Sequence, residues 1–281
     1  MDTEDLRVVS PWSLQRWISE ETVAQLEYSD YWNDEGHEHG KPFDVHDDFS
    51  KLERYLGDVG LIRDLTLCLN KLASPLAGRG IDLAAGTLWA APILLKSAAV
   101  ECVYCLEYSK HRLLTIGPRV LTHYEVSPER VVLVYGSFYD LHLEAGSLDF
   151  ALLSQAFHHA DRPAALLAEL RRVLKPGGQV IIVGEHIPRP RDYALYGVRA
   201  CASLLLPRDV QRRVLGHELD VHVSLRPSVD DVMPADPVLG DHAYSQAQYR
   251  ALFTQSGFAM RRVRRPRSHY QSFVLERRDD H

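Results

Sequence analysis

Residues 147–185 read SLDFALLSQAFHHADRPAALLAELRRVLKPGGQVIIVGE, and this stretch contains one complete strand–helix–strand unit. Apolar runs near 149–154 and 179–184 have the length of buried strands. Between them, Asp161 is placed to cap a helix that starts at Pro163, and KPGG at 175–178 predicts the turn that ends it. One face of this helix is apolar, with Leu166, Leu167, Leu170, Val173 and Leu174. The unit predicts two parallel strands joined by a crossover helix.

The same alternation of apolar runs and amphipathic segments extends in both directions. We predict strands near 80–84, 101–107 and 130–135, and a closing strand pair near 258–264 and 270–277. A helix before that pair has a capping-box spacing (Ser245, Gln248), a staple spacing (Tyr244, Tyr249) and a C-terminal stop (Gly257). The chain is therefore predicted to be an α/β protein.

Changes of pattern divide the 281 residues into four segments. Residues 1–75 are predicted to form a helical N-terminal cap, and residues 76–186 a Rossmann-like core. Residues 187–243 carry several prolines and the apolar stretch CASLLLP, which indicates a lid insertion over the substrate site. Residues 244–281 supply a C-terminal helix and strand pair that complete the core.

Composition narrows the class of function. The net charge is −6, and residues 1–60 hold fifteen Asp and Glu against five Lys and Arg, which disfavours a nucleic-acid partner. The four cysteines suggest no disulfide framework. Lys96 and Glu101 interrupt the best apolar stretch, so we expect no membrane association, and no signal peptide is recognised. A cytoplasmic enzyme is the expectation.

Ligands of an open parallel sheet bind beyond the carboxyl ends of its strands, so functional residues are expected in the loops there. In IDLAAGTLWAA (81–91), Asp82 lies on a strand and is followed by small residues that let a ligand approach the backbone. Glu107 ends the next strand, where its carboxylate can accept both hydroxyls of a ribose.

Four stretches resemble, in order, the motifs of class I S-adenosylmethionine (SAM) methyltransferases of the small-molecule, type 11-like branch. IDLAAGT resembles the glycine-rich first motif, LEYS (106–109) the acidic ribose motif, YGSFYDL (135–141) the adenine-contacting loop, and 147–185 the segment around the fourth strand. The resemblance implies a seven-stranded, mostly parallel sheet with an antiparallel terminal strand. It implies SAM as cofactor, bound at the core by Asp82, Ala84, Gly86, Glu107, Ser137, Phe138 and Ser154.

The chain departs from the family pattern at three positions. Ala84 and Leu88 stand where the family usually has glycine, and Ser137 where it usually has an acid. We expect Leu88 to crowd the loop beneath the methionine moiety of the cofactor.

Histidines and an acid follow the fourth and fifth predicted strands. In related O-methyltransferases such groups act as base and orienter, which implies His159 as base with Glu185 or His158 orienting it. The alternative is that His158 packs under the loop and His159 caps the next helix. Candidate substrate contacts are Tyr31, Trp32 and His186. No metal site is expected, since the cluster His37, Glu38 and His39 fits a solvated loop better.

Methyl transfer to a hydroxyl or amine of a small metabolite is the leading functional hypothesis, and a homodimer is kept as a hypothesis for assembly. One alternative is a different displacement at the sulfonium that releases methylthioadenosine. The other is a non-catalytic protein with this fold.

Overall fold

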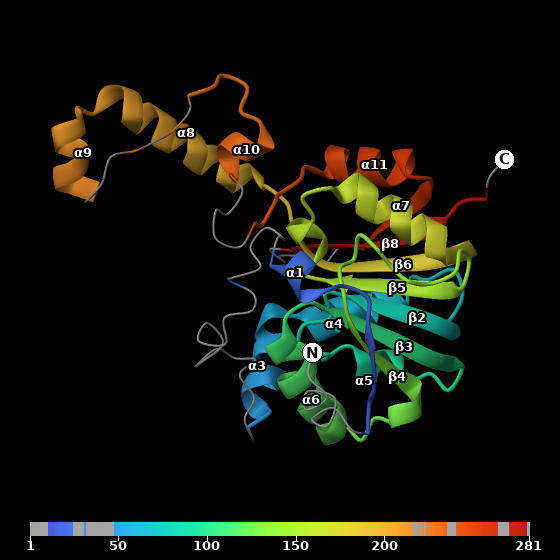
Figure 1. The fold of residues 1–281 in the computed structure, drawn as a ribbon. Coiled ribbons are helices and arrows are strands. Elements are labelled where there is room, and N and C mark those ends of the chain that lie inside the picture. Colours follow the sequence, from blue (N-terminus) through green and yellow to red (C-terminus); the bar gives the residue numbers. More distant parts are fainter. Residues whose placement is uncertain are drawn as a thin grey trace.

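The computed structural model describes residues 11–24, 31, 48–215, 219, 221, 223–234, 240–263 and 270–279. One sheet of eight strands lies between two layers of helices (Figure 1). The strands are β1 Ser13–Arg16, β2 Gly78–Leu83, β3 Val100–Glu107, β4 Val131–Tyr135, β5 Leu148–Ser154, β6 Leu174–His186, β7 Phe258–Val263 and β8 Tyr270–Arg277.

The sheet has the order β1-β4-β3-β2-β5-β6-β8-β7. All neighbours from β1 to β6 pair in parallel, whereas β8 is antiparallel to both β6 and β7. The chain runs outward from β2 in one direction through β3 and β4, and in the other through β5 and β6. The switch point of the topology therefore lies between β2 and β5, where a ligand-binding crevice is expected.

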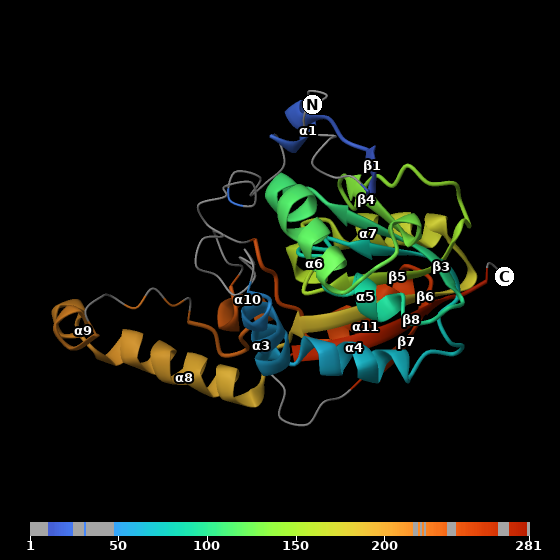
Figure 2. The same cartoon turned by 90° about the horizontal axis from the view of Figure 1, so that it is seen from below.

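Helices cover both faces because buried strand side chains alternate between them. On one face lie α3 Ser50–Val59, α4 Leu61–Leu69, α5 Ala91–Leu94 and α6 Gly117–His123, and on the other α7 Pro163–Val173 and α11 Gln246–Gln255 (Figures 1 and 2). A short helix, α1 Glu20–Val23, follows β1. Within the segment from β6 to α11 are α8 Pro190–Leu205, α9 Arg208–Leu215 and α10 Val229–Val232, and both views show α8 and α9 extending away from the sheet.

The predicted fold class is confirmed, but the sheet has eight strands instead of seven. The additional strand, β1, comes from the segment predicted to be a helical cap. It adds to the edge strand β4, and the next residue, Trp17, donates its backbone N–H to the Tyr135 carbonyl at 2.8 Å. Trp12 and Trp17 flank β1 and are both buried. The assignment of the rest of residues 1–75 as a cap, and of residues 187–243 as a lid, stays a prediction.

Two local predictions need correction. Arg162, not Asp161, is the N-cap residue of α7, and no side chain caps that end. Residues 175–178 lie inside β6, since Leu174 pairs with Leu148 and Gln179 with Phe150, so KPGG forms a bulge rather than a turn before the strand. At α11 the capping box is confirmed: Ser245 Oγ accepts the Gln248 N–H at 3.2 Å.

The loop after β2 is bent by three left-handed residues: Ala84 (φ 51°), Gly86 (56°) and Leu88 (61°). Side chains in this region cost about 1–2 kcal/mol, so glycine is usual there. Leu88 is nevertheless fully buried, in the core against Gly117 at the start of α6. The expectation that Leu88 crowds the cofactor end of the loop is wrong, because its side chain points into the core.

Gly117 has helical dihedral angles (φ −54°, ψ −50°), yet an added Cβ would lie 2.4 Å from Leu88 Cδ1. We predict that Gly117→Ala lowers the free energy of unfolding by about 1–3 kcal/mol through overpacking. In a Leu88→Ala background the cost should be much smaller, because only the Arg112 carbonyl oxygen, 3.1 Å from the added Cβ, remains close. Urea denaturation of the double-mutant cycle measures this reduction.

Gly57 provides the matched control, because it lies in α3 and an added Cβ would meet nothing within 4 Å. Gly57→Ala should stabilise the protein in both backgrounds by about 0.5–1 kcal/mol. Equal effects of Gly117→Ala in the presence and absence of the Leu88 side chain would contradict the packing described above.

Candidate functional site

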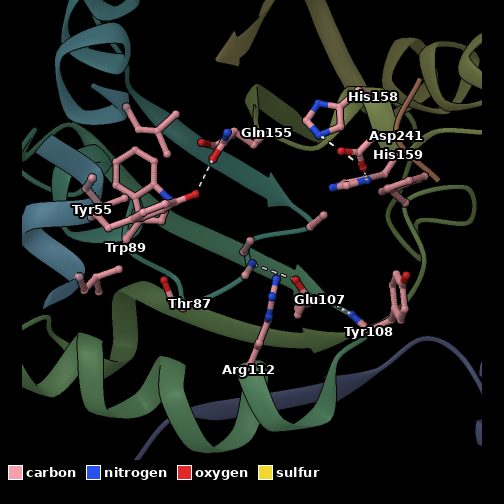
Figure 3. Close-up of a pocket in the computed structure, with 18 of the residues that line it drawn as sticks. Tyr55, Thr87, Trp89, Glu107, Tyr108, Arg112, Gln155, His158, His159 and Asp241 are labelled. Carbon is pink, nitrogen blue, oxygen red and sulfur yellow. Dashed lines mark hydrogen bonds and ion pairs between the residues drawn. The ribbon is translucent and has the colours of Figure 1, made fainter. Parts of the chain in front are cut away.

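A cavity of ≈ 410 Å³ opens at the carboxyl edge of the sheet, over the switch point (Figure 3). Its walls come from α3, the loop after β2, the ends of β3, β5 and β6, and the segment before α11. The lining residues are Tyr31, Leu52, Tyr55, Leu56, Leu61, Ala84, Ala85, Gly86, Thr87, Trp89, Glu107, Tyr108, Arg112, Phe138, Ser154, Gln155, His158, His159, His186, Asp241 and Tyr270.

Most residues predicted for the site line this one cavity. They are Tyr31, Ala84, Gly86, Glu107, Phe138, Ser154, His158, His159 and His186. Asp82, Ser137 and Glu185 do not line it, and Trp32 lies outside the described residues. The structure therefore brings the predicted cofactor residues and the predicted histidines together.

Glu107 holds two loops at the cavity floor. Its Oε2 accepts the Gly86 N–H at 2.8 Å, and its Oε1 accepts the N–H groups of Tyr108 and Ser109 at 2.8 and 2.9 Å. The residue is only 5% exposed, so these bonds compensate for the lost hydration of the carboxylate. The guanidinium of Arg112, from a π-helical turn at Arg112–Ile116, lies beside it (Figure 3).

Asp82 and Ser137 lie behind the cavity wall. Asp82 is buried within β2, between Cys105 and Leu152 of the neighbouring strands. Burial, and then the charge of Glu107, hold the pKa of Asp82 well above its usual value, which favours the neutral carboxyl. Ser137 accepts the Tyr139 N–H at 3.3 Å in the turn after β4. Neither residue is among those that line the cavity, and their predicted roles in cofactor binding stay predictions.

Glu185 orients His158. This fully buried carboxylate lies 3.0 Å from His158 Nδ1, accepts the Phe157 N–H at 3.2 Å, and accepts the Tyr249 hydroxyl at 3.4 Å. His158 is 3% exposed yet lines the cavity, so it is both packed under the loop and accessible to a ligand. The contact of Glu185 with His158 differs from the predicted one with His159.

Asp241 is the partner of His159 and was not predicted. Its Oδ1 lies 2.9 Å from His159 Nδ1 and 4.0 Å from His158 Nε2. The adjoining His242 N–H donates to the His158 carbonyl at 2.8 Å, which joins this segment to the 3₁₀ turn Phe157–His159. His159 does not cap α7, whose N-cap is Arg162. No spacing motif in the sequence signals Asp241, because it lies far along the chain from the histidines.

The cluster perturbs the ionisation of its members. Burial lowers the pKa of His158, but the charge and hydrogen bond of Glu185 outweigh it, so that pKa is raised overall. Burial and the neighbouring His158 lower the pKa of His186. Burial alone would raise the pKa of Asp241, but the hydrogen bond from His159 and the nearby imidazoles lower it. Opposite charges therefore stabilise one another at this end of the cavity.

The opposite end is aromatic. Figure 3 shows Tyr55 and Trp89 at one end and the cluster of His158, His159 and Asp241 at the other. Tyr55 donates its hydroxyl to Gln155 Oε1 at 3.4 Å. The cavity thus combines an apolar wall with a few polar groups that converge on one side, as small-molecule sites do.

The match to known families covers the strands around this cavity. Residues 81–182 match the family model described as "Methyltransferase domain". A curated protein named demethylmenaquinone methyltransferase, from Clavibacter sepedonicus, is 33% identical over 140 residues, which are 48% of this chain and 54% of that protein. The chain therefore spans about half the length of this relative.

Solved structures share the fold. A candidate O-methyltransferase of Nostoc punctiforme has a TM-score of 0.54 at 16% identity, covering 84% of this chain and 60% of that one. A candidate SAM-dependent methyltransferase of Methanococcus maripaludis has a TM-score of 0.50 at 14% identity, covering 80% and 88%. At such identities the likeness establishes the fold alone. Among the described residues, no helix has the length and apolar character of a membrane span.

Proposed function

We propose that this chain, whose residues 81–182 belong to the methyltransferase domain family, transfers a methyl group from SAM to a hydroxyl or amine of a small molecule. SAM is the cofactor that this family indicates. The observation that carries the proposal is that one cavity joins the loop after β2 and Glu107 to two imidazole–carboxylate pairs. Neither the release of methylthioadenosine nor a non-catalytic role is favoured by the family match.

The residues at the cavity fit the proposed cofactor. The left-handed residues Ala84 and Gly86 turn the loop so that its backbone faces the cavity. The Glu107 carboxylate lies where a ribose would be held, and Ser154 Oγ is buried at the cavity wall with no hydrogen-bond partner. A buried hydroxyl without a partner costs free energy that a polar ligand atom would recover.

When bound, SAM supplies a methyl group that its sulfonium activates for displacement. The protein must then align the acceptor and remove its proton. Because Nδ1 of His159 faces Asp241 Oδ1 at 2.9 Å, Nε2 is the atom that would accept the proton from the acceptor hydroxyl or amine. Glu185 holds the neighbouring His158 in the same way. We assign His159 as base and Asp241 as its orienting residue.

The aromatic wall formed by Tyr55 and Trp89 supports a flat, ring-bearing acceptor. The name of the Clavibacter relative, demethylmenaquinone methyltransferase, points to the same class of molecule. Such an acceptor would pack on the aromatic side chains and present its polar atom to the histidines.

Removal of Glu107 tests the cofactor site. We predict that Glu107→Ala weakens SAM binding about 10-fold or more, since charge-assisted hydrogen bonds contribute about 1.5–3 kcal/mol each. Calorimetric titration measures the dissociation constant, and thermal unfolding without ligand shows whether the variant is folded. Glu101→Ala is the control, because Glu101 is exposed at the opposite end of β3. Equal SAM affinity in both variants would show that Glu107 does not contribute to cofactor binding.

Removal of His159 tests the chemistry. We predict that His159→Ala lowers turnover about 10²-fold, in the usual range for a general base, while SAM affinity changes little. Asp241→Asn should lower it less, because the imidazole remains. Turnover is measured as release of S-adenosylhomocysteine with the best acceptor of a panel of ring hydroxyls and amines. A fall of less than about threefold for His159→Ala would favour transfer by alignment alone.

A further inference from the structure

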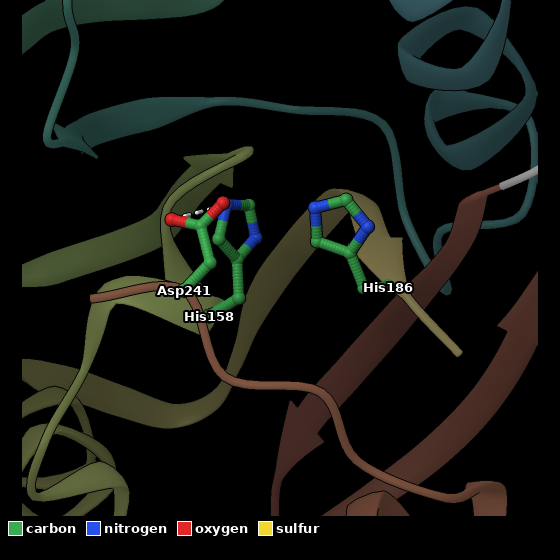
Figure 4. Close-up of side chains that lie close together, drawn as sticks. All are labelled: His158, His186 and Asp241. Atoms are coloured by element: carbon green, nitrogen blue, oxygen red, sulfur yellow. Dashed lines mark ion pairs between the residues drawn. The ribbon is translucent and has the colours of Figure 1, made fainter. Parts of the chain in front are cut away.

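We infer that His158, His186 and Asp241 form a binding site for a divalent transition-metal cation, at the acceptor end of the cavity. Each offers one donor atom, and the three donor atoms all lie within 4.8 Å of one another. His158 comes from the turn after β5, His186 from the end of β6, and Asp241 from the segment before α11, and they converge from these separate elements (Figure 4). Among the described residues this is the only such group.

The donor set selects the class of cation. Two imidazoles and one carboxylate suit Zn²⁺ and its first-row neighbours, whereas Mg²⁺ and Ca²⁺ prefer oxygen ligands. Bonds of about 2.0–2.2 Å place the donors of a tetrahedral site about 3.4 Å apart. His158 Nε2 and Asp241 Oδ1 are 4.0 Å apart and the three donors lie within 4.8 Å of one another, so the side chains must move roughly 1 Å closer together to coordinate one cation.

The outer partners of these ligands support the assignment. A histidine that binds a metal commonly donates its other ring N–H to a carboxylate, which fixes the ring for coordination. His158 has such a partner in Glu185, and Asp241 has one in His159. The same Oδ1 of Asp241 faces His159 Nδ1 and His158 Nε2, so binding a cation through Oδ1 requires the carboxylate to turn its second oxygen, Oδ2, toward His159.

His186 completes the group. Its ring faces that of His158 with centroids 4.8 Å apart and packs on Tyr270 with centroids 5.3 Å apart.

Three protein ligands leave a fourth position open, which is the arrangement of catalytic zinc sites. All three ligands line the cavity, so that position lies within it. A bound cation would hold an oxygen of the acceptor there, near His159. This role in orienting the acceptor rests on the proposed methyl transfer, but the binding of the cation does not. The proposed metal site departs from the sequence-based expectation that the protein binds no metal.

The experiment titrates Zn²⁺ into the full chain after removal of bound metal with a chelator, using calorimetry. We expect one Zn²⁺ per chain, and an affinity at least 10-fold lower in both His186→Ala and Asp241→Ala. These two residues are chosen because they are only partly buried, whereas loss of the buried His158 would disturb the core. Co²⁺ gives a second readout, since its visible absorption reports low-coordinate ligation and should fall in both variants.

Two controls separate this site from other histidines. His142→Ala removes a half-exposed histidine that pairs with Asp140 at 3.4 Å, and it should leave Zn²⁺ binding unchanged. The pair His37→Ala and His39→Ala removes the cluster outside the described residues and should also have no effect. Unaltered Zn²⁺ binding in His186→Ala and Asp241→Ala, or its loss in the His37 and His39 variant, overturns the inference.

The same samples are titrated with SAM, so the two proposals fail separately. Zn²⁺ binding at the three residues without SAM binding would leave the metal site standing and refute the methyl transfer. SAM binding without Zn²⁺ binding would refute the metal site and leave the methyl transfer standing. His159 would then act as general base with Asp241 as its orienting residue and no metal.

Discussion

The carboxyl ends of β2, β3, β5 and β6 meet at one edge of the sheet, and the candidate site depends on this arrangement. Parallel pairing places residues far apart in sequence at the same height, so that Ala84, Glu107, Ser154 and His186 surround one cavity. The apolar strands beneath are buried on both faces by helices, which fixes their register. The loop sequences can therefore vary while the strand ends from which the loops start stay in place.

Two buried carboxylates tie these loops together, one in each half of the cavity. Glu107 ends β3 and accepts backbone N–H groups from the loop after β2 and from its own loop. Glu185, near the end of β6, accepts the Phe157 N–H from the turn after β5 and contacts both His158 and Tyr249 of α11. Each carboxylate costs desolvation and recovers it through several hydrogen bonds. Glu107 lines the cavity itself, whereas Glu185 acts on it through His158.

Local sequence predicted the core of this fold and many of the residues that line the cavity. The five strands from β2 to β6, apart from the bulged start of β6, lie close to the predicted positions, because a buried parallel strand requires a continuous apolar run. β1 has no such run: it is four residues long, and its pairing with β4 and the burial of Trp12 and Trp17 define it. The orientation of the Leu88 side chain could not be predicted from local sequence either, since it depends on the space that Gly117 leaves at the start of α6.

The proposed acceptor end of the cavity is assembled differently from the proposed cofactor end. Its groups come from the end of β6, the segment before α11 and the start of β8, with Asp241 and Tyr270 joining His186 from distant parts of the chain. Contacts of this kind follow from tertiary packing, so no motif of fixed spacing reports them. The cofactor motifs, in contrast, lie next to the strands that position them. The proposed cofactor site is thus built from local motifs and the proposed acceptor site from long-range packing of histidines and Asp241, so the residues of the second can change without disturbing the first.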